Sequence, residues 1–309
     1  MRAESLRHQL DLLKKRYHVI RPEEFIQWLD GKDSLPSRSI LLTCDDALRN
    51  SLLEMVPILL EQGLSCLFFA TGDSADDAPS MLWYEELYLM LLEAKRPLHL
   101  SVPEAGLHFQ DVPPSEAHAG WWKLVGQLSR FDRKRRRDLL EQIRCQLNLP
   151  NNWQARIRED ETLASRFLLL NRAGLRQLSD AGMTIGAHSM SHPILARMPD
   201  ALVQQEICDS RRVLEETLEK KVWAFGYPFG DAATITKREV RLVEQAGFRC
   251  GFMNVGGGFG AKGNRFAWPR VHVTADMNVT DYEARISSFY RSLRVRVFRE
   301  HELEALVGG

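Results

Sequence analysis

The sequence predicts an α/β fold built around a parallel β-sheet. Short apolar runs of four to six residues alternate with amphipathic stretches at helical spacing, and such runs are typical of strands that are buried on both faces. Hydrophobic residues make up 44% of the 309-residue chain and charged residues 27%, which excludes the collagen-like, low-complexity and disordered classes. Strands that alternate with helices favour parallel pairing with right-handed crossovers, either in a barrel or in a doubly wound sheet.

The first elements follow this alternation. A helix is expected over residues 4–15, where Leu6, Leu10 and Leu13 lie on one stripe, and a second over Glu23 to Leu29. The apolar run from Ser39 to Cys44 predicts a buried strand. It is the first strand expected, because the residues before it show no strand pattern. The next elements expected are a helix over about 51–62 and a strand over 66–70.

Residues 74–165 interrupt the alternation. This segment is rich in proline and carries the aromatic pairs Trp83-Tyr84 and Trp121-Trp122 and the basic run Arg133–Arg137. We interpret it as a mostly helical insertion into a single domain spanning residues 1–309, with its clearest helix from Leu82 to Glu93.

The β/α alternation then resumes. The expected helices cover residues 172–181, 200–220 and 236–246, and the expected strands cover 183–187, 222–225, 248–252 and a late segment around 268–273.

The net charge argues against some classes of function for this chain, and the cysteine content indicates the cellular compartment. The chain has 41 basic and 41 acidic residues, so its formal net charge is 0, which argues against a dedicated nucleic-acid-binding protein. Five scattered cysteines without a Cys-x-x-Cys pair favour a reducing compartment. With no signal peptide or membrane span recognisable in this chain, we expect a cytoplasmic protein.

Polar residues follow two of the expected strands directly. Asp45 and Asp46 come after the strand 39–44, and His188 and His192 come after the strand 183–187. Since the carboxyl ends of parallel strands meet at one face, these side chains are expected to converge there. Each pair alone has an ordinary explanation, a helix N-cap for the carboxylates and surface decoration for the imidazoles. Together they form an N/O ligand set suited to a divalent metal ion such as zinc.

The same residues resemble three motifs of the polysaccharide deacetylase family, also known as the NodB-homology family or carbohydrate esterase family four. Residues 42–47, Leu-Thr-Cys-Asp-Asp-Ala, resemble its Thr-Phe-Asp-Asp-Gly motif. Residues 186–193, Gly-Ala-His-Ser-Met-Ser-His-Pro, and residues 224–230, Ala-Phe-Gly-Tyr-Pro-Phe-Gly, resemble the second and third. The resemblance covers about residues 35–275, apart from the insertion.

The resemblance implies a distorted (β/α) barrel and a metal-dependent hydrolase that removes an acetyl group, N-acetyl more often than O-acetyl, from a sugar. By position, Asp46, His188 and His192 would hold one divalent ion, most often zinc, with cobalt or nickel as alternatives. Asp45 would be the general base, and the backbone N–H of Tyr227 would stabilise the oxyanion.

Four departures from the family pattern are visible. Ala47 replaces a glycine, and no arginine precedes the Tyr-Pro-Phe segment, so we expect Arg270 to take the place of the arginine that orients the base. The general-acid histidine is not recognisable, and His272 is the nearest candidate, although a strand residue that faces away from the site explains it at least as well. We also expect that the family's first strand is missing or remodelled.

Two interpretations of function remain open at this point. The first is a polysaccharide deacetylase acting on an acetylated glycan, and the alternative is a catalytically impaired carbohydrate-binding relative that retains the metal pocket. The aromatic pairs of the insertion could stack on sugar rings, and the run Arg133–Arg137 could make peripheral contact with an anionic surface. Oligomeric state is not predicted.

Overall fold

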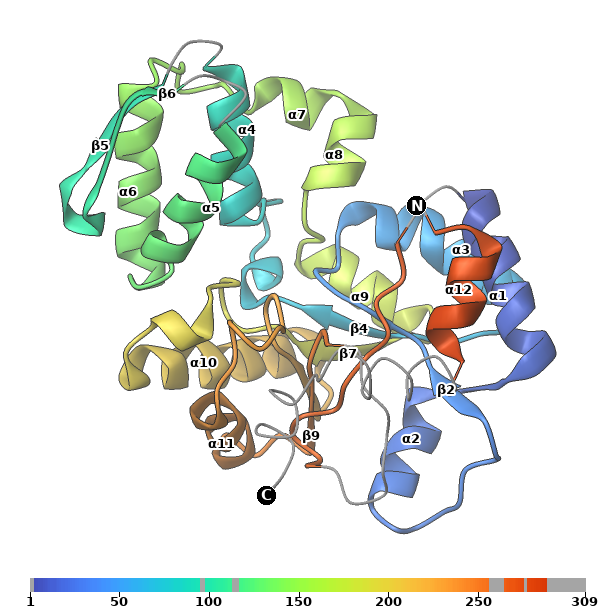
Figure 1. Cartoon of the computed structure of the whole chain (residues 1–309). Coiled ribbons are helices and arrows are strands. Elements are labelled where there is room, and N and C mark those ends of the chain that lie inside the picture. Colours follow the sequence, from blue (N-terminus) through green and yellow to red (C-terminus); the bar gives the residue numbers. More distant parts are fainter. Residues whose placement is uncertain (1–2, 95–97, 113–116, 256–263, 275–276, 288–309) are drawn as a thin grey trace.

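A five-stranded parallel sheet forms the centre of the computed structural model, which describes residues 3–94, 98–112, 117–255, 264–274 and 277–287 (Figure 1). The strand order is β3-β4-β7-β8-β9, and every pair in it is parallel. The strands are β3 (Thr43–Cys44), β4 (Leu67–Ala70), β7 (Thr184–Ala187), β8 (Ala224–Gly226) and β9 (Cys250–Phe252). The predicted α/β class with a parallel sheet is therefore confirmed.

The central strands are buried on both faces, as the apolar runs predicted. All four residues of β4 are inaccessible to solvent, and β8 and β9 are buried throughout. The ring of Phe69 lies directly over two neighbouring glycines, because a Cβ at Gly186 or Gly226 would come within 2.7 Å of it. These glycines therefore let a large aromatic side chain lie flat against the adjacent strands.

A second, two-stranded parallel sheet adjoins the first. It pairs β1 (His18–Ile20) with β2 (Ser39–Leu41), so the expected strand 39–44 changes partner at Leu42 between β2 and β3. The family's first strand, expected to be missing or remodelled, is not missing, since β1 is present, and it pairs with β2 outside the five-stranded sheet. Three residues between two helices are too short to give a readable period.

Helices pack around the sheet and share one apolar cluster with β4, β7 and β8. The side chains that join this cluster come from α1, α3, α9, α10, α11 and α12, while Phe25 of α2 packs on the opposite side with Phe69 and Phe252. Their bounds are α1 (Ala3–Arg16), α2 (Pro22–Leu29), α3 (Val56–Glu61, preceded by a π-helical turn at Ser51–Met55), α9 (Arg172–Asp180), α10 (Asp200–Leu218), α11 (Lys237–Gln245) and α12 (Val279–Ile286). All the helices expected outside the insertion are thus present.

The insertion (residues 74–165) forms a separate lobe beside the sheet (Figure 1). It has its own apolar cluster, which includes Leu87, Leu100, Leu124 and Ile143. Its elements are α4 (Trp83–Glu93), β5 (Leu98–Val102), β6 (Leu107–Val112), α5 (Ala117–Leu128), α6 (Arg133–Gln146), α7 (Ala155–Glu159) and α8 (Glu161–Phe167). The antiparallel hairpin β5–β6 was not predicted, because its short strands lie in the proline-rich part of the segment, where proline argues against strands.

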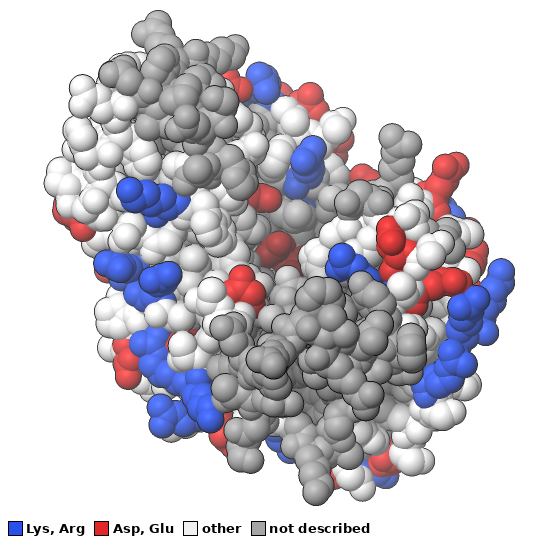
Figure 2. All heavy atoms as spheres, in the orientation of Figure 1, with Lys and Arg blue, Asp and Glu red and all other residues white. Residues whose placement is uncertain are grey.

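The basic run of the insertion does not form an open cationic face. Arg133 pairs with Asp73 and Asp76, Lys134 with Asp138, and Arg135 with Glu104. Arg136 is buried, which leaves Arg137 exposed. On the face drawn in Figure 2, basic and acidic side chains are likewise interspersed. The expected peripheral contact through Arg133–Arg137 is therefore not supported.

The segment expected as a late strand is not one among the described residues. A single parallel bridge joins Phe252 to Trp268. Pro269 follows at once and has no N–H to continue the pairing.

Candidate active site

Three loops that leave the carboxyl ends of β3, β7 and β8 meet at one edge of the sheet. Asp45 and Asp46 follow β3, His188 and His192 follow β7, and Phe229 follows β8. Of the eight non-glycine residues with positive φ in the described part of the chain, five lie in these loops. They are Asp46 (70°), Ala47 (51°), Ser189 (60°), His192 (54°) and Phe229 (62°). Such backbone costs on the order of 1–3 kcal/mol per residue and is concentrated at functional sites.

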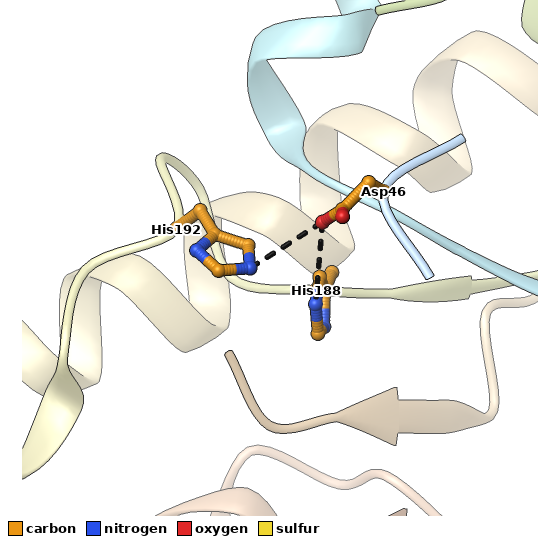
Figure 3. A group of neighbouring side chains, drawn as sticks. All are labelled: Asp46, His188 and His192. Carbon is orange, nitrogen blue, oxygen red and sulfur yellow. Dashed lines mark ion pairs between the residues drawn. The ribbon is translucent and has the colours of Figure 1, made fainter. Parts of the chain in front are cut away.

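Asp46, His188 and His192 point toward one another (Figure 3). Oδ1 of Asp46 lies 3.6 Å from Nε2 of His188 and 3.3 Å from Nε2 of His192, and one ligand atom from each residue lies within 4.8 Å of the others. Both imidazoles are almost inaccessible to solvent. The sequence prediction that these three residues meet in space is therefore correct.

The protonation states of this group fit a cation. Burial lowers the pKa of His188 and lowers that of His192 well below its usual range, which favours the neutral form of both imidazoles. Nδ1 of His188 lies 2.7 Å from the carbonyl oxygen of Gly226, which makes Nδ1 the protonated nitrogen and leaves a lone pair on Nε2.

Asp46 lacks a partner that would stabilise its charge. Oδ1 is buried without a hydrogen bond to any residue that the structure describes, and burial together with the charges of Asp45 and Glu85 raises the pKa of Asp46 well above its usual range. A buried carboxylate oxygen facing two neutral imidazoles is the donor set that a divalent ion satisfies.

Asp45 has the opposite surroundings. Arg270 holds it with two parallel hydrogen bonds, Nη1 to Oδ1 at 2.6 Å and Nη2 to Oδ2 at 2.7 Å. Arg270 also donates to Thr43 Oγ1 and to the carbonyl of Met253. Burial by itself would raise the pKa of Asp45, but the charge and hydrogen bonds of Arg270 lower it below its usual range. The arginine expected to replace the missing one thus contacts the expected base.

The backbone N–H of Tyr227 is not available to stabilise an oxyanion, which was its expected role. Its backbone N–H donates to the carbonyl of Phe252 at 3.0 Å within the β8–β9 pairing, and its phenol donates to the carbonyl of Phe266 at 2.8 Å. A backbone N–H has one hydrogen, so this group cannot also serve an oxyanion without leaving the sheet. The expectation for Tyr227 is corrected: its side chain is a core residue, 1% exposed.

His272, the candidate general acid, is exposed. No hydrogen bond, ion pair or ring contact of the described residues joins it to Asp45, Asp46 or the two histidines. The alternative interpretation, a residue that faces away from the site, describes its position better.

The insertion places aromatic side chains, for which the sequence suggested stacking on sugar rings, beside the histidines. The ring of Tyr84 lies 5.0 Å from that of His192, and Phe229 lies 4.7 Å from it on another side. Trp122, 43% exposed, lies 5.5 Å from Phe229. The paired aromatics at 83–84 and 121–122 were the available signal, but only the folded chain shows that they border the histidines. In Figure 2 the surface is hollowed between the insertion and the rest of the molecule.

A family model described as polysaccharide deacetylase matches residues 155–251, the segment that carries both histidines and the third motif. Over this segment the chain matches the polysaccharide deacetylase model, as the sequence resemblance predicted, and the match favours the predicted enzyme class, a hydrolase of this type. The first motif, with Asp45 and Asp46, lies outside the matched residues.

Solved structures share the fold at low sequence identity. The Streptococcus pyogenes deacetylase PplD in complex with acetate is 13% identical, covers 92% of this chain and 87% of its own, and has a TM-score of 0.56. IcaB from Ammonifex degensii is 16% identical over 89% of this chain and 85% of its own, with a TM-score of 0.51. A de-N-acetylase from Aggregatibacter actinomycetemcomitans is 12% identical over 91% and 87%, with a TM-score of 0.53. The predicted deacetylase-type barrel fold is confirmed, while no curated protein sequence matches the chain.

In the part of the chain that the structure describes, no helix has the length and apolar character needed to cross a membrane. The cytoplasmic location stays a prediction.

Proposed function

We propose that this protein is a divalent-metal-dependent deacetylase that removes an acetyl group, N-acetyl in preference to O-acetyl, from a sugar of a polysaccharide or its precursor. The observation that carries the proposal is the meeting of Asp46, His188 and His192 beside the ion-paired Asp45. Three protein ligands leave a coordination position open, which is typical of catalytic rather than structural metal sites.

The ligand set suits zinc and also accepts cobalt or nickel. When bound, such an ion lowers the pKa of water toward about 7 and polarises a carbonyl oxygen. Asp46, His188 and His192 would hold it, with the bond from His188 to the Gly226 carbonyl keeping that imidazole in the required tautomer.

Asp45 is the proposed proton acceptor. Its carboxylate stays ionised because of Arg270, so it can take a proton as water attacks the acetyl carbon. A carboxylic acid with so low a pKa gives a proton up readily, and the same proton is then available to the departing amine. The products are acetate and a free amino sugar, and this route needs no contribution from His272.

The aromatic side chains around His192 support a glycan as substrate. Tyr84, Phe229 and Trp122 form a run of rings from the metal-binding histidine to the surface. The apolar faces of sugar rings pack on aromatic side chains of this kind.

One observation favours the alternative, a carbohydrate-binding relative with impaired turnover. The N–H of Tyr227 is engaged in the sheet and His272 is exposed, so neither supplies the role expected of it. Such a protein would bind metal and glycan and release no acetate.

The deciding experiment measures metal content together with acetate release from acetylated chito-oligosaccharides and from an aryl acetate. We expect about one ion per chain in the wild type, its loss in His188→Ala, and loss of acetate release in both His188→Ala and Asp45→Asn. A bound ion without acetate from either substrate would favour the binding-only alternative. A wild type that takes up no ion after reconstitution would contradict both.

A further inference from the structure

We propose that Arg136, in helix α6 of the insertion, is a positioning residue that fixes the loop carrying the two metal-binding histidines and thereby sets the affinity and geometry of the metal site. The loop is residues 188–194, called here the histidine loop. The inference rests on the proposed metal site for part of its test, and it concerns a residue outside all three motifs.

Arg136 is buried, and burying a charged guanidinium is energetically unfavourable. It is 1% exposed and is the only buried arginine among the described residues. Its guanidinium lies 3.7 Å from the buried carboxylate of Glu206 in α10 and 4.9 Å above the ring of Trp83 in α4. Removing a guanidinium from water is unfavourable unless its partners are well placed, so this burial indicates a specific set of contacts.

Those contacts lead to the histidine loop. Arg136 Nη2 donates to the hydroxyl of Ser191, the residue directly before His192. The same hydroxyl donates to Glu206 Oε1 at 2.5 Å, and the Ser191 N–H donates to Glu206 Oε2 at 2.8 Å. Arginine, serine and glutamate thus form one buried network, fully paired at Ser191, between the insertion and the loop.

Two further residues of the insertion hold the same loop. Trp83, on which the Arg136 guanidinium stacks, donates its Nε1–H to the carbonyl of His192 at 2.9 Å. The hydroxyl of Ser129, just after α5, accepts from the Ile194 N–H at 3.1 Å. Contacts from α4, α6 and the end of α5 therefore hold the loop at His192 and on either side of it.

The loop needs such support because its backbone is strained. Ser189 and His192 have φ values of 60° and 54°, a conformation that persists in non-glycine residues only where surrounding contacts enforce it. Partners outside the ligand set that orient metal ligands change metal affinity by about 10–100-fold when they are lost. Among these contacts from the insertion, Arg136 supplies the charged group, which binds Ser191 and Glu206 and so helps to hold the strained histidine loop.

The test compares Arg136→Met, which keeps an unbranched stem without the charge, with Arg136→Lys, which restores a charged donor. Lys134→Met on the exposed face of the same helix is the matched control, since Lys134 pairs at the surface with Asp138 and with no other described residue. Zinc affinity is measured by competition with a chromophoric chelator, and the visible absorption of the cobalt-loaded protein reports ligand geometry. Hydrogen exchange of residues 188–194 is measured in the metal-free protein.

We expect Arg136→Met to weaken zinc binding by about 10–100-fold, to change the cobalt spectrum and to accelerate exchange in the histidine loop, with partial rescue in Arg136→Lys and wild-type behaviour in Lys134→Met. If Arg136→Met does not fold, Ser191→Ala removes the hydroxyl that receives the guanidinium and should produce the same changes. Folded variants with wild-type zinc affinity, spectrum and exchange would overturn the inference. A wild type that binds no metal would instead count against the proposed function, and the exchange measurement would still decide the role of Arg136.

Discussion

Asp45 and Asp46 are neighbours in the chain, yet the fold gives them opposite electrostatic surroundings. Asp45 receives two hydrogen bonds from Arg270, which keep it ionised although it is partly buried. Asp46 has a left-handed backbone that turns its carboxylate toward the imidazoles, and its Oδ1 has no hydrogen bond. This separation of surroundings is how two like side chains acquire different chemical roles.

Weakening the Arg270 contact should shift the pH dependence of activity. Arg270→Lys keeps a charge but loses the paired geometry, so the pKa of Asp45 rises. Because only ionised Asp45 accepts a proton, the acidic limb of kcat/KM should move to higher pH than in the wild type. The measurement is a pH profile of acetate release. Arg265→Lys, at an exposed arginine that pairs elsewhere, should leave the profile unchanged.

The two aspartates should also separate in metal binding. Asp45→Asn is expected to lower kcat by roughly 10²–10⁴ through loss of the proton acceptor while zinc remains bound, and Asp46→Asn is expected to lose the ion itself. Metal analysis and acetate release on the same preparations check this. If Asp45→Asn lost its metal as readily as Asp46→Asn, the assigned roles would be wrong.

At the scale of elements, the short strands β4, β7 and β8 that position the site loops pack closely on the ring of Phe69. The ring of Phe69 in β4 packs on Gly186 of β7 and Gly226 of β8. The Arg270 guanidinium lies 5.4 Å above the same ring. The position of β8 against the Phe69 ring therefore depends on the absence of a side chain at Gly226, and the loop that carries Phe229 starts from this strand.

Gly226→Ala should destabilise the fold. A Cβ there would come within 2.7 Å of Phe69 Cγ, and overpacking of this kind costs about 1–3 kcal/mol in the free energy of unfolding. Gly126→Ala is the control, because Gly126 lies in α5 with nothing within 4 Å of the added Cβ, and alanine is favoured there by up to about 1 kcal/mol. Urea denaturation measures both, and a neutral Gly226→Ala would contradict the packing argument.

On the scale of the whole molecule, the insertion and the barrel meet at the histidines. The insertion packs its own apolar cluster, and Phe229 from the β8 loop joins that cluster. The same lobe presents Trp122 to solvent beside Phe229. This arrangement places an exposed aromatic surface next to the proposed reaction centre.

Trp122→Ala should raise KM for an acetylated oligosaccharide without changing hydrolysis of an aryl acetate, which is too small to need the ring. The expected loss is on the order of 10-fold at most, from a stacking energy of about 0.5–1.5 kcal/mol, with Trp122→Phe intermediate. Leu92→Ala, at another exposed apolar residue of the insertion, should have no effect. Equal losses for both substrates would place the effect of Trp122 in folding rather than in recognition.

Much of this architecture follows from local patterns. The apolar runs predicted β4, β7, β8 and β9 because buried parallel strands carry that pattern regardless of what surrounds them. Asp46, His188 and His192 could be grouped before any coordinates existed, because the ends of parallel strands converge at one face. The short β1, the hairpin β5–β6 and the absence of a strand near residue 270 could not be derived, since three-residue elements and proline-rich segments give no readable period.

The sequence by itself determined the α/β class, the resemblance to the polysaccharide deacetylases and the grouping of Asp46, His188 and His192, because these depend on residue type and on order along the chain. Tertiary structure decided which groups are available for chemistry. It engaged the Tyr227 N–H in the sheet, exposed His272, joined Arg270 to Asp45 across 225 residues and carried Arg136 from the insertion to the histidine loop. Hydrogen bonds and burial depend on distances in space, and contacts between residues so far apart in sequence leave no local pattern to read.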